Sequence, residues 1–129
     1  MKEIYTKYRC GDMSVLYLRD TEKDTVGLPL LPESLADQAV LEGWWNIEPA
    51  VQLKLVGDGY AQGFAQGHSM RNSVSTQSLR FREQRTEKKE EGLRVVTVLV
   101  DERVEARHYL EYRIGTDYLR MYSEVTALS

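Results

Sequence analysis

The sequence has little of what marks a metalloprotein, a disulfide-stabilised protein or a membrane protein. In 129 residues it has one cysteine, Cys10, and two histidines, His68 and His108. A single cysteine excludes an intramolecular disulfide and a multi-cysteine metal site, so we expect no metal and a reducing compartment, the cytoplasm. No apolar run has the length of a signal peptide or of a membrane span, so we expect no membrane partner.

Positive charge is also scarce. The 17 lysines and arginines are outnumbered by 20 aspartates and glutamates, which gives a formal net charge of -3. Nucleic-acid binding depends on clustered basic side chains that displace counterions, and no such cluster stands out, so we expect no nucleic-acid partner. The mixed charges and an apolar share of 42% instead indicate a single folded domain over residues 1–129.

A two-residue periodicity dominates what is present. Over 104–114 apolar residues alternate with charged ones, which predicts a half-buried antiparallel strand. A turn signal at 115–117 is followed by alternation over 119–127, and this predicts the second arm of a hairpin. Residues 93–100 are apolar on both faces, which is typical of a strand in the middle of a sandwich.

The N-terminal half continues the pattern. Residues 3–8 and 12–19 predict a hairpin through Gly11, and Pro29 predicts an edge strand or its end. Residues 50–56 predict a further strand, with alternate apolar side chains on one face.

Two segments depart from simple alternation. The charged run at 82–92 predicts a hairpin loop with charged strand ends, and 32–43 predict a short helix that begins near a proline and ends at a glycine. The sum is seven or eight short strands with at most one helix. This pattern predicts an all-β fold, an antiparallel β-sandwich.

The stretch "GDGYAQGFAQGHSMRNS" at 57–73 carries four glycines among polar residues. Its spacing fits neither a dinucleotide-binding loop nor a serine-nucleophile turn, so we expect no cofactor and no catalytic residue here. The glycines instead predict a long ordered loop that lies against a partner, with His68 as a candidate ligand contact and the serines on a strand edge. His108 falls on an apolar strand face, which favours a hydrogen-bonded core histidine.

The segment "EPAVQLKLVGDGYAQGFAQGHSMRNSVSTQSLRF" at 48–81 resembles part of the N-terminal β-domain of the bacterial family-36 glycoside hydrolases, the α-galactosidases that act on raffinose and melibiose. The flanks "KYRCGDMSVLYL" and "VVTVLVDERVEARHYLEYRIGTDYLRMYSEVTA" resemble that domain in the same order, so the resemblance covers nearly the whole chain. The chain departs from the family at Ala61-Gln62, where Pro-Gly is usual, and is shorter between Leu31 and Trp44.

The resemblance implies a supersandwich of the galactose-mutarotase-like kind, of which this chain matches the first half. The family's catalytic aspartates lie in a following (β/α)8 barrel, so the resemblance implies a non-catalytic part of a retaining α-galactosidase. It implies three partners: the (β/α)8 catalytic domain, further copies in a homo-oligomer, and α-galactoside sugars. Half a sandwich exposes an apolar patch, and we expect a dimer that covers it.

Carried over by position, Asp58 and Arg71 are the residues expected to bind sugar hydroxyls, because carboxylate and guanidinium groups bind them by paired hydrogen bonds. Asn72 contributes, and Trp44 or Trp45 supplies an aromatic face beneath the ring. The alternative is that Arg71 and Asn72 only brace the loop. Two other functions remain open: a stand-alone carbohydrate-binding or assembly β-domain without catalysis, and a scaffold without a ligand.

Overall fold

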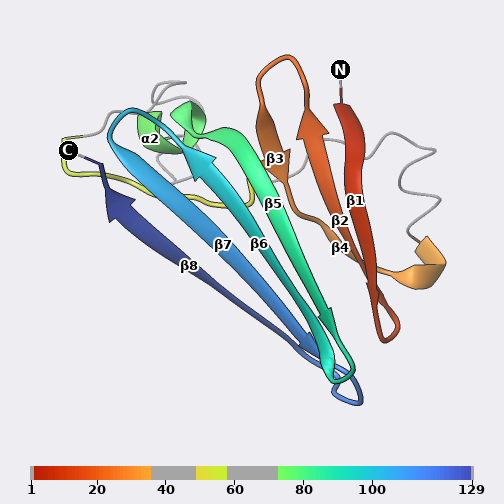
Figure 1. Ribbon diagram of the computed structural model, residues 1–129. Helices are drawn as coiled ribbons and strands as arrows, with labels where there is room; N and C mark the ends of the chain where they lie inside the picture. The colour runs from red at the N-terminus through yellow and green to blue at the C-terminus, as the bar shows by residue number, and fades with distance from the viewer. Residues whose placement is uncertain (1, 36–48, 58–72, 129) are drawn as a thin grey trace.

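The computed structural model describes residues 2–35, 49–57 and 73–128. These residues form two antiparallel sheets of four strands each, shown in Figure 1. The inner faces of the two sheets share one apolar core. The predicted all-β antiparallel sandwich is therefore confirmed, and the closer kinship to supersandwich domains stays a prediction.

The first sheet is built around β2. Its strands are β1 (Lys2–Cys10), β2 (Met13–Asp20), β3 (Thr25–Gly27) and β4 (Leu30–Pro32). β1 forms the predicted hairpin with β2 through Gly11, whose φ of 63° is readily adopted only by glycine. β3 and β4 pair with opposite ends of the other edge of β2. Pro29 falls between them, where its carbonyl accepts from the Leu16 N–H at 3.2 Å and no N–H is needed.

The second sheet is a meander in chain order. Its strands are β5 (Arg80–Lys89), β6 (Gly92–Val100), β7 (Val104–Arg113) and β8 (Leu119–Ala127). The apolar strand predicted at 93–100 is β6, and it lies between β5 and β7 as expected. The predicted hairpin of β7 and β8 is also confirmed, with its pairing unbroken from Tyr112↔Leu119 to Val104↔Ala127.

The core lies between the inner faces of the sheets. Its least exposed side chains come from β2, β6 and β7: Val15, Tyr17, Val95, Ala106 and Leu110. β5 lies next to the first sheet, where the backbone N–H of Phe81 donates to Asp24 O at 2.6 Å. β8 lies at the opposite edge, on the far side of β7 from the first sheet (Figure 1).

The loop predicted at 82–92 is too long, although the predicted hairpin and its charged strand ends are confirmed. β5 continues to Lys89, and only residues 90–91 make the turn. The run is a strand because Gln84 and Thr86 hydrogen-bond inward to β1 while the charged side chains occupy the solvent face. Gly92 follows the turn because a Cβ at this position would lie 2.0 Å from the carbonyl oxygen of Tyr112.

The prediction of a strand at 50–56 is wrong, although the prediction that alternate apolar side chains face the same way is correct. Val51 and Leu53 are buried, but the only ladder contact around this described segment is a bridge between Pro49 and Gly27. The backbone N–H and C=O of Leu53 bond to the side chains of Ser73 and Thr76 instead of to a neighbouring strand. Of the helix predicted at 32–43, Pro32 belongs to β4 and 33–35 are helical; the rest lies outside the described residues.

Candidate functional site

Six residues that the sequence nominates for ligand contact lie outside the described part of the chain: Trp44, Trp45, Asp58, His68, Arg71 and Asn72. Their roles stay predictions. The structure describes the residues on either side of the glycine-rich segment, which we call its base: the described chain stops at Gly57 and resumes at Ser73.

A cluster of buried hydroxyls joins the two ends of that base. Ser73 Oγ donates to Leu53 O at 2.5 Å, and Thr76 Oγ1 donates to the same carbonyl at 2.9 Å. Thr76 Oγ1 also accepts from the Leu53 N–H at 2.9 Å. Because all these atoms are buried, the bonds hold the two ends of the glycine-rich segment side by side.

The same hydroxyls begin the helix α2 (Val74–Ser78). Ser73 is its N-cap, and Ser73 Oγ accepts from the Thr76 N–H at 3.1 Å, which satisfies a donor left free by the first turn. Ser75 and Ser78 lie in this helix, so the strand edge expected for them is wrong. The physical reason is that short hydroxyl side chains bond to nearby backbone and favour caps over ladders.

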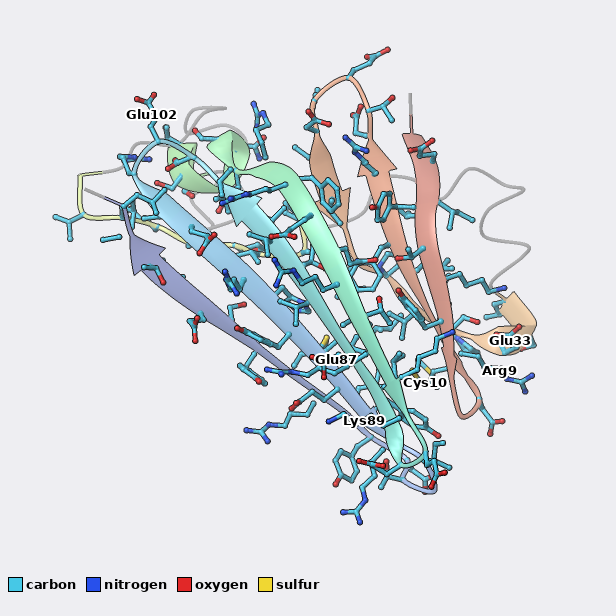
Figure 2. The ribbon with its side chains drawn as sticks, in the orientation of Figure 1. Arg9, Cys10, Glu33, Glu87, Lys89 and Glu102 are labelled. Atoms are coloured by element: carbon cyan, nitrogen blue, oxygen red, sulfur yellow. The ribbon has the colours of Figure 1, made fainter. Side chains whose placement is uncertain are left out.

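A charged turn braces α2 from the second sheet. Arg103 Nη2 donates to Ser75 Oγ at 2.7 Å and lies 3.4 Å from Asp101 Oδ2. Asp101 Oδ1 accepts from the backbone N–H groups of Arg103 and Val104 at 2.7 and 3.1 Å. This carboxylate is fully engaged in holding the turn, at the sheet end where Figure 2 labels Glu102.

A polar row crosses the inner face of the second sheet. Gln84, Thr97, His108 and Ser123 are register partners on the four successive strands. Gln84 Nε2 donates to Thr97 Oγ1 at 3.0 Å, and Gln84 Oε1 accepts from Thr6 of β1 at 2.7 Å. The row therefore begins in bonds to the first sheet and ends on β8, where Ser123 is exposed.

His108 is the buried centre of this row. Only 6% of its surface is exposed, and burial lowers the pKa of its imidazole, so it is neutral at pH 7. Nδ1 has no hydrogen-bond partner among the described residues. The predicted core position of His108 is confirmed. The expected hydrogen bond is not found at Nδ1 among the described residues. A neutral ring cut off from solvent serves packing rather than acid-base chemistry.

The cysteine is equally inert. Cys10 is 4% exposed and belongs to the core, and burial raises the pKa of its thiol, so the reactive thiolate is disfavoured. Nearby, Glu33 accepts a hydrogen bond from Ser14 Oγ and lies 3.8 Å from Lys7 Nζ. The Ser14 bond, aided by Lys7, lowers the pKa of Glu33. In the described ranges, no three His, Cys, Asp or Glu side chains gather as metal ligands would.

The outermost strand of the second sheet differs from its neighbours. The inner face of β7 is buried, with Leu110 fully covered, but on β8 the register partner Met121 is 43% exposed and Val125 is 48% exposed. Within residues 2–35, 49–57 and 73–128, no strand pairs with the outer edge of β8. In general, unpaired strand edges and exposed apolar strips are sites where another polypeptide can pair.

The solvent face of β8 is ordered by aromatic contacts. The rings of Tyr122 and Tyr109 stack at 4.6 Å with an interplanar angle of 8°. The Arg94 guanidinium lies 4.9 Å from the centroid of the Tyr109 ring, and Arg120 lies 5.2 Å from that of Tyr122. A hydrogen bond to the Tyr122 hydroxyl raises the pKa of Arg94, so the cation is retained. The strand is therefore held in place although its edge is free.

Sequence reasoning missed two parts of this surface. The hydroxyl cluster had a weak signal, a serine at the start of "SVSTQS", which is a common N-cap residue. The resemblance implied an exposed apolar patch but not its place on β8, because alternation over 119–127 reports which side chains share a face and not whether anything covers that face.

Over the described residues the fold is an all-β antiparallel sandwich in which no strand pairs with the outer edge of β8. No family model, curated protein or solved structure matches the chain. In the described ranges, no helix has the length and apolar character to cross a membrane.

Proposed function

We propose that this chain is a non-catalytic assembly module that associates with further copies of itself through β8. The observation that carries the proposal is the exposed apolar strip of Met121 and Val125 on a strand whose outer edge is unpaired among the described residues. Association would remove both the strip and the free backbone groups from water, and each removal favours the assembled state.

The chemistry of the described side chains supports a structural role. Asp101 is occupied by two backbone amides and by Arg103, and His108 is buried in the polar row. Each of these groups stabilises the fold where it stands. Neither is exposed in a cleft together with a second titratable group, the arrangement that acid-base catalysis requires.

The sequence resemblance extends the proposal to a parent enzyme. On that resemblance alone, the module belongs to the N-terminal part of an α-galactosidase-like hydrolase of the cytoplasm, beside a (β/α)8 catalytic domain. Asp58, Arg71, Asn72 and Trp44 would then form part of the rim of the sugar site. The described base supports this reading, because buried hydroxyl bonds bring the two ends of the glycine-rich segment together.

Light scattering on the full chain over a range of concentrations tests the assembly role. We expect the chain to form dimers, and Val125→Lys to shift it to monomers because the substitution places a charge on the inner strip. Thr126→Lys is the matched control, since it adds the same charge on the solvent face of the same strand. A monomeric wild-type chain, or dimers that survive Val125→Lys, would contradict the proposal.

The sugar contact has a separate test. Titration with galactose or raffinose should change the tryptophan fluorescence of the wild-type chain, and Asp58→Asn or Arg71→Ala should abolish the change. Absence of any change in a folded chain would remove the sugar part of the proposal and leave the assembly role intact.

A further inference from the structure

The backbone of β8 offers a defined set of hydrogen-bonding groups at its open edge. At the end of the β7–β8 ladder, Leu128 N donates to Arg103 O at 2.8 Å. At the end of the β6–β7 ladder, Ile114 N donates to Glu91 O at 2.8 Å, so even-numbered residues of β7 bond to β6 and odd-numbered ones to β8. Hydrogen-bonded and non-hydrogen-bonded pairs alternate along an antiparallel ladder. Even-numbered residues of β8 therefore bond to β7, and odd-numbered residues direct their N–H and C=O groups outward: Leu119, Met121, Ser123, Val125 and Ala127.

We propose that β8 pairs antiparallel with β8 of a second copy, about a two-fold axis that passes midway between the two copies of Tyr122, so that two sheets become one continuous sheet. The inference rests on the proposed assembly function and names its partner, its geometry and its register. β8 suits such pairing because its nine residues contain no proline and its register with β7 has no shift.

The register follows from the two charges on the solvent face of β8. In a two-fold pairing, outward-directed residues must meet outward-directed residues, so the axis passes between the two copies of one residue rather than between neighbouring residues. An axis at Tyr122 places Arg120 of each copy opposite Glu124 of the other. This is the arrangement that opposite charges favour in cross-strand pairs.

The neighbouring registers lack this match. An axis at Arg120 brings two arginines together, and an axis at Glu124 brings two glutamates together, both of which are repulsive. An axis at Met121 sets Arg120 against Tyr122, and an axis at Ser123 sets it against Thr126. Charge complementarity therefore selects the axis at Tyr122 among the registers that overlap most of the strand.

The two charged side chains are available for this contact. The Arg120 side chain is 73% exposed, with its closest carboxylate oxygen, on Glu111, at 3.8 Å. Glu124 is exposed and forms no ion pair with any of the described residues. In the proposed register Leu119 of each copy lies beside Val125 of the other, so Val125 gains an apolar cross-strand neighbour.

Cysteine cross-linking tests the register directly. Residues at the axis of a non-hydrogen-bonded pair lie about 4.5 Å apart between Cα atoms, within reach of a disulfide. Tyr122→Cys should form covalent dimers under mild oxidation at concentrations where Glu124→Cys does not. The native Cys10 is buried and should stay unreacted in both variants. Faster cross-linking of Glu124→Cys would overturn the proposed register.

Charge exchange gives a second test that needs no oxidation. Arg120→Glu or Glu124→Arg alone places like charges opposite each other in both symmetric pairs, and should weaken dimerisation at least about tenfold by sedimentation equilibrium. The double variant restores opposite charges and should return to within a few-fold of wild type. A double variant as weak as the single ones would overturn the inference.

The outcomes separate the two proposals. Suppose that the dimers are lost in Val125→Lys, that Tyr122→Cys does not cross-link, and that the double variant does not recover dimerisation. These results would overturn the register and leave the assembly function standing. A wild-type chain that is monomeric at every concentration would overturn both.

Discussion

The two edge strands of the second sheet, β5 and β8, differ in how far the rest of the described chain covers them. The β5 edge lies against the first sheet: Thr6 Oγ1 donates to Gln84 Oε1 at 2.7 Å, and Tyr8 Oη lies 2.5 Å from Thr86 Oγ1. Its pairing with β6 also contains a register shift after Phe81. The β8 edge is regular, and no described strand pairs with it. Bulges and coverage protect edges, so the contrast locates the surface left for association.

The protected edge is also where cations meet aromatic rings. The Arg19 guanidinium lies 4.9 Å from the centroid of the Phe81 ring and is paired with Asp24 at 2.5 Å. The backbone carbonyl of Asp24 accepts from Phe81 N, so a single loop residue connects the two sheets through both side chain and backbone. The open edge has an equivalent aromatic group, Tyr122 on Tyr109, but this contact lies within one sheet.

The largest difference between covered and uncovered strands should come from Leu110 and Met121, which are register partners on one face. Leu110→Ala opens a cavity in the core and should lower the free energy of unfolding by about 2–5 kcal/mol. Met121→Ala should lower it by less than about 1 kcal/mol in dilute solution, because its side chain is already part-solvated. Urea denaturation at low protein concentration measures both. Equal losses would show that β8 is covered in the monomer.

The hairpin turns of the two edges should differ next. Gly92→Ala forces a Cβ against the Tyr112 carbonyl oxygen, and should cost about 2–3 kcal/mol because backbone must move. At Gly115 the φ is 88° with nothing within 4 Å, so Gly115→Ala should cost only about 1 kcal/mol of strain. Thermal unfolding followed by circular dichroism ranks the two variants, and the reverse order would contradict this account of the β5–β6 hairpin.

A smaller effect should separate the two ends of the polar row. Thr6→Val removes the donor to Gln84 Oε1 and should cost about 1 kcal/mol, because a part-buried acceptor loses its partner. Ser123→Val, at the exposed end of the same row, should change the free energy of unfolding by no more than about 0.5 kcal/mol. Denaturant titration of both variants is the measurement. A larger loss for Ser123→Val would mean that the open end is buried in the monomer.

The sequence predicted what depends on local pattern. Alternation located β7 and β8, and the two-sided apolar run located β6 in the middle of its sheet. It could not predict that 50–56 has no strand partner among the described residues, because Val51 and Leu53 alternate as in a strand although their neighbour is a helix cap. The charged run in β5 was mistaken for a loop for a related reason: its inward positions hold Gln84 and Thr86, whose partners lie about 80 residues away in β1.

The candidate site was less predictable than the fold. The residues nominated for sugar contact lie outside the described chain, and the alternation over 119–127 did not show that the inner face of β8 is exposed. Whether a strand is an edge depends on what pairs beyond it, which is a property of the whole assembly. The one trace in sequence is the Arg120-x-x-x-Glu124 spacing, and this has meaning only once the outward-directed residues are known.

A pH dependence is expected at the middle of the polar row. Burial lowers the pKa of folded His108, while the unfolded chain has the ordinary value of about 6.5. As pH falls through that value, the unfolded chain binds a proton that the folded chain does not, so the free energy of unfolding decreases. One such proton accounts for at most about 1.4 kcal/mol per pH unit. His108→Gln should therefore show a smaller loss between pH 7.5 and 5.5 in urea denaturation. The difference between the two proteins also reports on the edge: if β8 lifted away from β7 and admitted water to His108, its pKa would return to the ordinary value and the two pH profiles would coincide.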